Sequence, residues 1–205
     1  MPPNMTIDLA EKQFLIVGHK GSGKTTLAKH ILNQVSPEDH LVYDPLGEYV
    51  GYRRYVPRDR RDPEEANTFI REVALPYKPK VLLFDEGNAY TRPKPARLEP
   101  YMQHLVDFSR HEGIAFGVIA RRPVQLHSDL VELANYYFVF NLHGTNDIKR
   151  LNETYMGMGN TVRGLDLHYF AILAEGRELT VHTPIPYGDE NIGEISPERI
   201  TTNAG

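Results

Sequence analysis

The sequence predicts an α/β protein with a mainly parallel central sheet flanked by helices. Short apolar runs alternate with segments of helical periodicity along the 205 residues, which is typical of repeated strand–helix units. Residues 81–84 are apolar throughout, as expected of a central strand covered on both faces. Residues 169–173 and 179–182 flank the turn sequence Glu175-Gly176-Arg177, which predicts a C-terminal β-hairpin.

The strands expected before this hairpin are short apolar runs bounded by turn or helix signals. They are residues 14–17, 41–43, 81–84, 114–119 and 136–140. A glycine-rich turn at residues 18–23 follows the first of these strands, and Asp44-Pro45 ends the second. This spacing leaves room for a helix between most pairs of strands.

The helices are predicted from their start signals and apolar spacing. Residues 24–34 form the expected first helix, directly after the glycine-rich turn. Asp62 is followed by Pro63 and two acidic residues, which is typical of a helix N-terminus. The apolar positions expected on the helical faces are Phe69, Ile70 and Val73 in that helix, Leu98, Met102, Leu105 and Val106 in the next, and Ile148, Leu151 and Tyr155 in a helix capped by Thr145.

Composition excludes several other classes of protein. Apolar residues make up 40% of the chain and charged residues 24%, which is typical of a folded globular protein. No apolar run approaches the ~18–20 residues of a membrane span, and the N-terminus lacks a signal-peptide core, so no transmembrane segment is expected. There is no cysteine, which excludes disulfide scaffolds and thiol catalysis. The histidines are scattered without a third ligand nearby, so no zinc site is expected.

The domain organisation is predicted to be simple. Neither an internal repeat nor a linker divides the chain. We therefore predict one domain over residues 1–187 and a polar C-terminal tail over residues 188–205.

A phosphate-binding motif follows the first strand. Gly18-His-Lys-Gly-Ser-Gly-Lys24-Thr25 matches the P-loop pattern G-x-x-x-x-G-K-[ST], and it lies between an apolar strand and a helix, as the motif requires. Its backbone amides and the helix N-terminus are suited to phosphate oxygens. Lys24 is expected at the terminal phosphates of ATP, and Thr25 at a magnesium ion. The predicted nucleotide-binding residues are Gly18, His19, Lys20, Gly21, Ser22, Gly23, Lys24, Thr25 and Thr26.

An acidic pair follows the apolar strand 81–84. Asp85 and Glu86 stand at the carboxyl end of this strand, where open α/β sheets bind their ligands. Asp85 is expected to hold magnesium, and Glu86 to orient the water that attacks the γ-phosphate. Because a separate carboxylate serves a water nucleophile, the pair favours ATP hydrolysis over phosphoryl transfer to a small molecule.

A third motif lies after the second strand, where the sequence reads Val42-Tyr-Asp44-Pro45-Leu-Gly47-Glu48-Tyr49. Together with the P-loop and Phe84-Asp85-Glu86, this motif resembles the FtsK/HerA superfamily of P-loop motor ATPases. Residues 109–114 and Ala120-Arg121-Arg122-Pro123 also resemble that superfamily, in which an arginine precedes the fourth strand and a Thr-Gln-Arg-Pro-like element follows it. The resemblance covers residues 13–145. It implies a RecA-like sheet, a ring that is commonly a hexamer, and DNA translocation driven by ATP.

The arginines of the later motifs are candidates for the remaining catalytic roles. Arg110 is expected to be a finger that completes the site of a neighbouring subunit; the alternative is a surface arginine near a helix end. Arg122 is the second candidate finger. Ala120-Arg121 stands where many relatives have a Thr-Gln sensor, so Arg121 is a candidate replacement that acts through its charge.

Local basic patches are the candidate DNA contacts, because the net charge of −4 excludes a generally basic surface. Residues 51–61 hold five arginines against one aspartate, and residues 91–97 hold three basic residues and no acid. Either patch is alternatively a solvated loop or a salt-bridge surface between subunits. The candidate residues are Arg92, Lys94, Arg97, Arg53 and Arg54. Their expected partner is double-stranded DNA, contacted through its phosphates.

The size of the chain indicates which members of the FtsK/HerA superfamily it resembles most. The sequence shows neither the N-terminal barrel of HerA nor the membrane and DNA-orienting domains of FtsK. A motor of this size is similar to the genome-packaging ATPases of tailless icosahedral viruses with internal membranes. That similarity implies packaging of viral DNA into a preformed capsid, in the host cytoplasm or at a capsid vertex of the virion, with capsid-vertex or membrane proteins as further partners.

Two other functions share the same motifs. A small-molecule or nucleotide kinase has a P-loop and a similar size, and its arginines would bind an acceptor phosphate. An ATP-gated assembly or morphogenesis protein would use the nucleotide to stabilise an oligomer. The contiguous Asp85-Glu86 pair counts against both, because it is suited to turnover with water.

Overall fold

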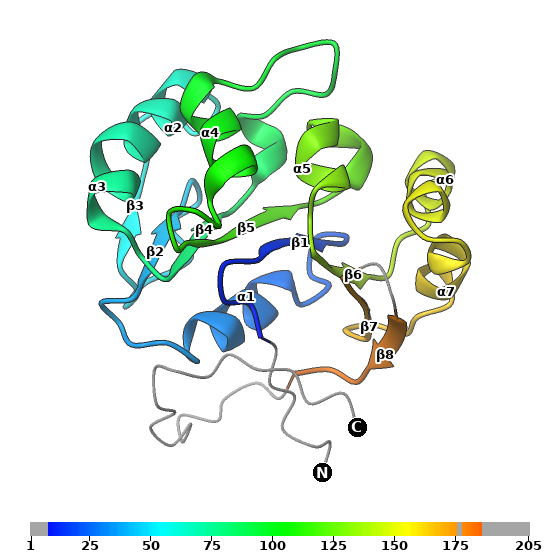
Figure 1. Cartoon of the computed structure of the whole chain (residues 1–205). Helices are drawn as coiled ribbons and strands as arrows, with labels where there is room; N and C mark the ends of the chain where they lie inside the picture. Colours follow the sequence, from blue (N-terminus) through cyan, green and yellow to red (C-terminus); the bar gives the residue numbers. More distant parts are fainter. Residues whose placement is uncertain (1–7, 176–177, 186–205) are drawn as a thin grey trace.

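Eight strands form one sheet in the order β3-β2-β4-β5-β1-β6-β7-β8 in the computed structural model, which describes residues 8–175 and 178–185 (Figure 1). The strands are β1 (Gln13–Val17), β2 (His40–Tyr43), β3 (Arg54–Tyr55), β4 (Val81–Phe84), β5 (Ala115–Ala120), β6 (Tyr136–Phe140), β7 (Phe170–Ala174) and β8 (Glu178–His182). All pairings from β3 across to β6 are parallel, whereas β7 is antiparallel to both β6 and β8. The mainly parallel sheet and the C-terminal hairpin are thus confirmed.

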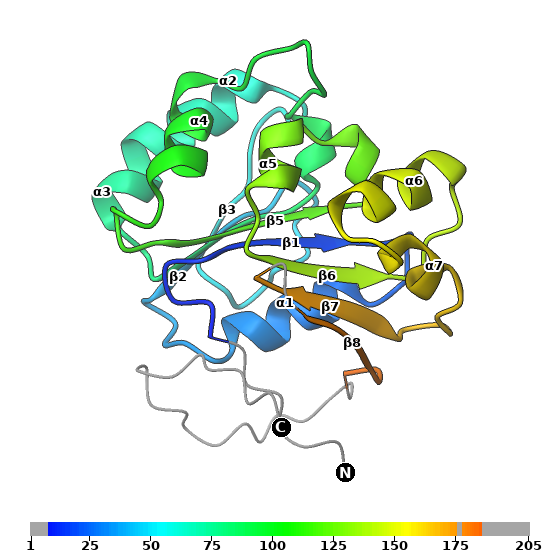
Figure 2. The same ribbon diagram turned by 45° about the vertical axis from the view of Figure 1, so that its right-hand side comes forward.

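Helices cover the two faces of the sheet unequally. The helices are α1 (Lys24–Leu32), α2 (Pro63–Phe69), α3 (Leu75–Tyr77), α4 (Pro100–Phe108), α5 (Ser128–Glu132), α6 (Thr145–Thr154) and α7 (Met158–Arg163). Helix α1 lies against one face, and α2, α4 and α5 lie against the other (Figure 2). None of the helices in the described part of the chain has the length and apolarity to cross a membrane.

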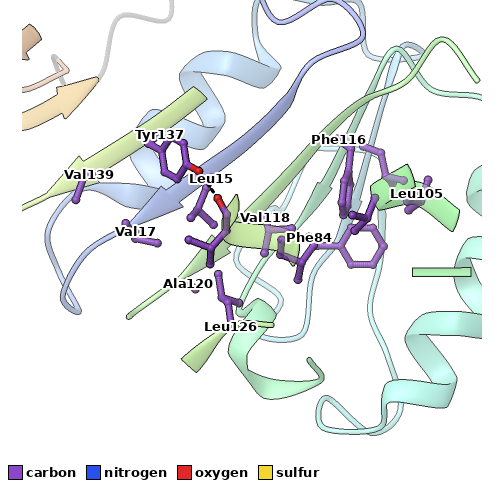
Figure 3. Close-up of a cluster of buried hydrophobic side chains, with 14 of the residues drawn as sticks. Leu15, Val17, Phe84, Leu105, Phe116, Val118, Ala120, Leu126, Tyr137 and Val139 are labelled. Atoms are coloured by element: carbon purple, nitrogen blue, oxygen red, sulfur yellow. Dashed lines mark hydrogen bonds between the residues drawn. The ribbon is translucent and has the colours of Figure 1, made fainter. Parts of the chain in front are cut away.

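The alternating side chains of the strands build two separate cores. Phe14 and Ile16 of β1 pack with Leu27 and Ile31 of α1 on the face that α1 covers. The neighbouring residues of β1 point the other way into a larger cluster, where residues from β4 and β5 meet α4 (Figure 3). Among the labelled members of this cluster are Leu15, Val17, Phe84, Leu105, Phe116 and Val118. Burial on both faces explains why the central strands are apolar without alternation.

The second predicted helix differs from its expected form. Asp62 caps it as predicted, since its side chain accepts a hydrogen bond from the Glu64 N–H at 3.0 Å. At residues Ile70–Ala74 the helix widens into a π-helical turn, and it ends at Tyr77. The extra residue per turn rotates Val73 outward, so Val73 is exposed and does not share the buried face of Phe69 and Ile70, contrary to the expectation.

Several short elements were not predicted. β3 is only two residues long and lies in the arginine-rich stretch, which has no apolar alternation. Helices α5 and α7 span five and six residues, too few to show a period. In addition, α1 ends at Leu32 and α4 begins only at Pro100, after Leu98. The predicted tail over residues 188–205 lies outside the described residues, so the boundary at 187 stays a prediction.

Candidate nucleotide-binding site

The phosphate loop connects the end of β1 to the start of α1. Gly23 caps α1 with a φ of 108°, a backbone conformation in which any other side chain is strained. Lys24 folds back over the loop, where its Nζ donates a hydrogen bond to the His19 carbonyl at 2.7 Å. The four N–H groups at the start of a helix lack partners within it, so this loop presents backbone donors to an anion. The strand–loop–helix geometry predicted for the P-loop is present.

The effects of charged groups on the pKa of Lys24 show which of them lie near it. Burial lowers the pKa of Lys24, and the negative charges of Asp85 and Glu86 oppose this shift. The positive charge of Arg121 lowers the same pKa further, while Glu48 raises it. The loop, the end of β4 and the end of β5 therefore meet at one edge of the sheet, as expected of the carboxyl ends of parallel strands.

Asp85 is a buried carboxylate at the carboxyl end of β4. Burial raises the pKa of Asp85 to about 7, and the negative charges of Glu86 and Glu48 add to that shift, which the Glu86 N–H partly opposes through a 2.8 Å hydrogen bond. A bound cation would favour the ionised form. Asp85 and the Thr25 hydroxyl supply the oxygen ligands that Mg²⁺ prefers. Across the described residues, no three His, Asp or Glu side chains are grouped to hold a metal on their own. Asp85 and Thr25 are the residues here that could hold Mg²⁺ together with nucleotide phosphates.

Glu86 is held in an unusual backbone conformation and by an arginine. Its φ is 50°, in the left-handed region that non-glycine residues seldom adopt. Its carboxylate Oε1 accepts hydrogen bonds from Arg121 Nε at 3.1 Å and from Nη2 at 2.9 Å. Because β5 lies between β1 and β4, residue 121 at its end lies between the loop and the acidic pair. Arg121 thus belongs to the same site in the same chain.

Arg122, the neighbouring residue, has a different partner. Its Nε donates to Asp147 Oδ2 at 2.8 Å, and Asp147 is fully buried near the start of α6. A buried carboxylate depends on such a pair for its charge. Arg122 therefore ties the end of β5 to α6 within one chain, which is not the geometry of a free finger.

Glu48 reaches the site from a turn after β2, and the sequence reasoning did not place it there. Its Oε2 accepts a hydrogen bond from Thr25 Oγ1 at 3.2 Å. The signal was available, because Glu48 follows a buried strand that is parallel to β4 and ends at the same edge as Asp85.

The remaining loop residues divide into exposed and buried positions. His19 and Lys20 are exposed, and the His19 ring stacks on His143 with 5.8 Å between the ring centroids. The Ser22 hydroxyl is buried and has no hydrogen-bond partner in the described part of the chain. Thr26 is half-buried in the first turn of α1. All of these residues lie on the loop or at the helix start, as the motif predicted.

Arg110 lies far from this edge. It stands in the turn between α4 and β5, just before Ala115, which pairs with the first residue of β4. Arg110 is therefore at the amino edge of the sheet, opposite the phosphate loop. It is exposed, and its side chain has no ion pair or hydrogen bond within the described ranges. In its own chain Arg110 does not reach the nucleotide site.

Each basic patch holds one cation in an ion pair and others that are exposed. Arg54 pairs with the fully buried Asp44 at 2.8 Å, and Arg53 stacks over the Tyr77 ring at 4.9 Å. In the other patch, Lys94 pairs with Asp129 on α5 at 2.7 Å. Its two other cations are exposed, and neither has an ion pair in the part of the chain that the structure describes; they are Arg92 and Arg97.

The phosphate loop on β1, the acidic pair on β4 and the strand order between them define the RecA-like P-loop NTPase fold. No protein-family model matches the sequence, and no curated protein matches it. Among solved structures, the genome-packaging NTPase B204 of Sulfolobus turreted icosahedral virus 2, in complex with ATPγS, matches with a TM-score of 0.75. The identity is 18% over 88% of this chain and 100% of that chain.

Two further structures have the same fold. B204, the DNA-packaging ATPase of Sulfolobus turreted icosahedral virus, matches with a TM-score of 0.68 and 19% identity, over 86% of this chain and 99% of that chain. The N-terminal domain of zonular occludens toxin from Neisseria meningitidis matches with a TM-score of 0.56 and 13% identity, over 86% and 95% of the two chains. The expected likeness to viral genome-packaging ATPases is thus confirmed at the level of the fold.

Proposed function

We propose that this protein hydrolyses ATP and uses the energy to translocate duplex DNA into a viral capsid. The observation that carries the proposal is the convergence of Lys24, Asp85 and Glu86 at one edge of the sheet, where their charges act on one another. The likeness in fold to B204, a genome-packaging NTPase solved with ATPγS, supports the same activity. The chain spans nearly the whole of that protein.

Each residue of the edge has a distinct task in hydrolysis. The loop amides and Lys24 would bind the phosphates of ATP, and Thr25 and Asp85 would hold Mg²⁺, which would supply positive charge to offset that of the phosphates. Glu86 orients the attacking water as its hydrogen-bond acceptor. Arg121 holds Glu86 through two hydrogen bonds and lies near enough to Lys24 to act on its pKa. Arg121 thus positions Glu86, and it stands where many members of the resembled superfamily have a Thr-Gln sensor.

A neighbouring subunit completes the site in this proposal. The two candidate cations of the same chain, Arg121 and Arg122, already bind Glu86 and Asp147. Arg110 is exposed at the opposite edge, where it can meet only the site of another copy. An arginine is suited to this role, because its planar fork contacts two phosphate oxygens at once. The assembly that follows is a ring, most simply a hexamer.

The DNA contact is proposed for the loop between β4 and α4. Arg92 and Arg97 are exposed there, and Lys94 is exposed apart from its pair with Asp129. This loop leaves the catalytic strand, so a movement at the acidic pair passes directly into it. Exposed cations contact DNA phosphates without reading bases. Arg54 is less suited to DNA, because Asp44 already binds it.

The proposed setting is a viral one. The packaging ATPase would act in the cytoplasm of the host cell and would dock at a capsid vertex during genome entry. Capsid-vertex or membrane proteins are its expected partners there. Co-purification of the chain with viral particles tests this part separately from the enzymology.

The decisive experiment is an ATPase assay with and without duplex DNA, read beside the native mass of the protein. We expect turnover without any phosphoryl acceptor, stimulation by duplex DNA, and a mass several times that of one chain. Turnover only with an added acceptor would identify a kinase. Turnover without DNA stimulation, in an oligomer that ATP stabilises, would identify an assembly protein.

A further inference from the structure

The Thr25 hydroxyl is held by a carboxylate that does not belong to the P-loop or to the acidic pair. Thr25 Oγ1 lies 3.2 Å from Glu48 Oε2 and donates its hydrogen to it. A hydroxyl has one hydrogen to donate and two lone pairs to offer. When its hydrogen is engaged by Glu48, the lone pairs remain available to a cation.

The turn that carries Glu48 is built to hold it in place. The buried carboxylate of Asp44 accepts hydrogen bonds from the N–H groups of Glu48 and Tyr49, each at 3.0 Å. Arg54 neutralises that carboxylate at 2.8 Å. Gly47, with a φ of 72°, lets the chain reverse just before Glu48. Asp44, Arg54 and Gly47 therefore fix the backbone from which the Glu48 side chain extends.

The far end of the turn is anchored against α1. Tyr49 is fully buried in the core on that face, and Lys29 of α1 lies 5.6 Å from the centre of its ring. Because Thr25 is in the first turn of the same helix, this packing places the backbone of residue 48 beside Thr25. The exposed Glu48 side chain reaches the Thr25 hydroxyl from that position.

The charge of Glu48 also acts on the rest of the cation site. It contributes to the raised pKa of Asp85, whose main cause is burial, and it opposes the burial that lowers the pKa of Lys24. Glu48 therefore lies near both of the groups that face the phosphates. Glu48 has no role in the hydrolysis proposed above.

We propose that Glu48 is a positioning residue for Mg²⁺, which acts by orienting the Thr25 hydroxyl. The inference rests on the proposed function, because it assumes that Thr25 and Asp85 hold Mg²⁺ with a nucleotide. Residues that hold metal ligands in place contribute about 10- to 100-fold to metal affinity. In this view the motif after β2 is part of the cation site, and Asp44, Gly47 and Arg54 are its support.

The test measures binding of a fluorescent ATP analogue in EDTA and along a Mg²⁺ titration, so that no turnover is needed. Glu48→Ala should bind the analogue in EDTA as the wild type does and should need about 10- to 100-fold more Mg²⁺ to reach tight binding. Glu48→Gln keeps an acceptor oxygen for Thr25 and should retain most of the Mg²⁺ response. Glu153→Gln, an exposed change on α6, is the matched control.

The outcomes separate this inference from the proposed function. If the wild type binds no nucleotide, the proposed function fails. If the wild type binds and Glu48→Ala keeps the full Mg²⁺ response, the inference is overturned. An equal loss in Glu48→Gln and Glu48→Ala also overturns it, because the charge and not the acceptor would then matter. As a further check, Glu48→Ala should add little to Thr25→Ala, since both remove the same hydrogen bond.

Discussion

The carboxyl edge and the amino edge of the sheet carry different candidate functional residues. At the carboxyl edge, side chains from separate loops converge, and Arg121 and Glu86 already bind each other. At the amino edge, Arg110 is exposed and has no partner among the residues described. In the proposed function, the carboxyl edge binds the nucleotide and orients water, whereas Arg110 at the amino edge acts on the site of a neighbouring copy.

The largest effect is expected at the amino edge. Arg110→Ala should still bind ATP but lose about 10³-fold or more in turnover, the scale of a finger that stabilises transferred charge. Mixing Arg110→Ala subunits with Glu86→Gln subunits sharpens the comparison. If Arg110 acts in a neighbouring site, some interfaces in mixed rings contain both intact residues, and ATPase activity returns. If mixed rings that are shown to exchange subunits recover no ATPase activity, Arg110 does not act in the site of a neighbouring subunit.

The next effect concerns the carboxyl edge itself. Glu86→Gln should keep nucleotide binding and lose about 10²- to 10⁴-fold in turnover, because the amide keeps the shape and loses the base that orients water. Lys24→Ala should instead weaken binding, since it removes the cation at the phosphates. Binding of a fluorescent nucleotide and steady-state ATPase rates separate these two variants. Equal ATPase rates for Glu86→Gln and the wild type would contradict the assignment.

A smaller effect is expected from the loop that leaves the carboxyl edge. Neutralising Arg92, Lys94 and Arg97 together should reduce DNA stimulation of the ATPase and leave basal turnover nearly intact. Each lost phosphate contact should lower the log–log salt slope of DNA binding by about one unit. The matched comparison is Arg54→Gln, which should mainly destabilise the fold, since Asp44 is then buried without its partner. An unchanged salt slope in the triple variant would move the DNA contact elsewhere.

The smallest effect is expected from His40, at the amino end of β2. Burial lowers the pKa of His40, and its Nε2 accepts a 3.4 Å hydrogen bond from the Arg53 N–H, which requires the neutral ring. The unfolded chain takes up a proton near pH 6.5, whereas the folded ring takes it up only at lower pH. The free energy of unfolding should therefore fall as the pH drops below about 6.5. His40→Gln should flatten this slope in urea titrations; an identical slope would contradict the assignment.

Much of the carboxyl edge could be predicted from the sequence, because its signals are local. The P-loop and the acidic pair each follow an apolar strand, so Lys24 and Asp85 are found by inspection. Their convergence follows from the parallel strands that the same pattern predicts.

The contacts between side chains could not be predicted in this way. The pairing of Arg121 with Glu86 depends on the position of β5 between β1 and β4, which no local pattern encodes. The pairing of Arg54 with Asp44 depends on the folded turn after β2, and that of Lys94 with Asp129 depends on the packing of the loop against α5, so no local pattern shows which cation of each patch is paired. The outward rotation of Val73 depends on a π-helical turn, for which the apolar spacing gives no sign.

The backbone of Glu86 has a consequence for the stability of the fold. A left-handed residue other than glycine costs the fold about 1–2 kcal/mol, and Glu86 adopts such a conformation with a φ of 50°. Glu86→Gly should therefore melt at a higher temperature than Glu86→Gln while both are inactive, which thermal unfolding of the two variants can measure. If Glu86 orients water as proposed, its strained backbone is a stability cost that the proposed activity imposes.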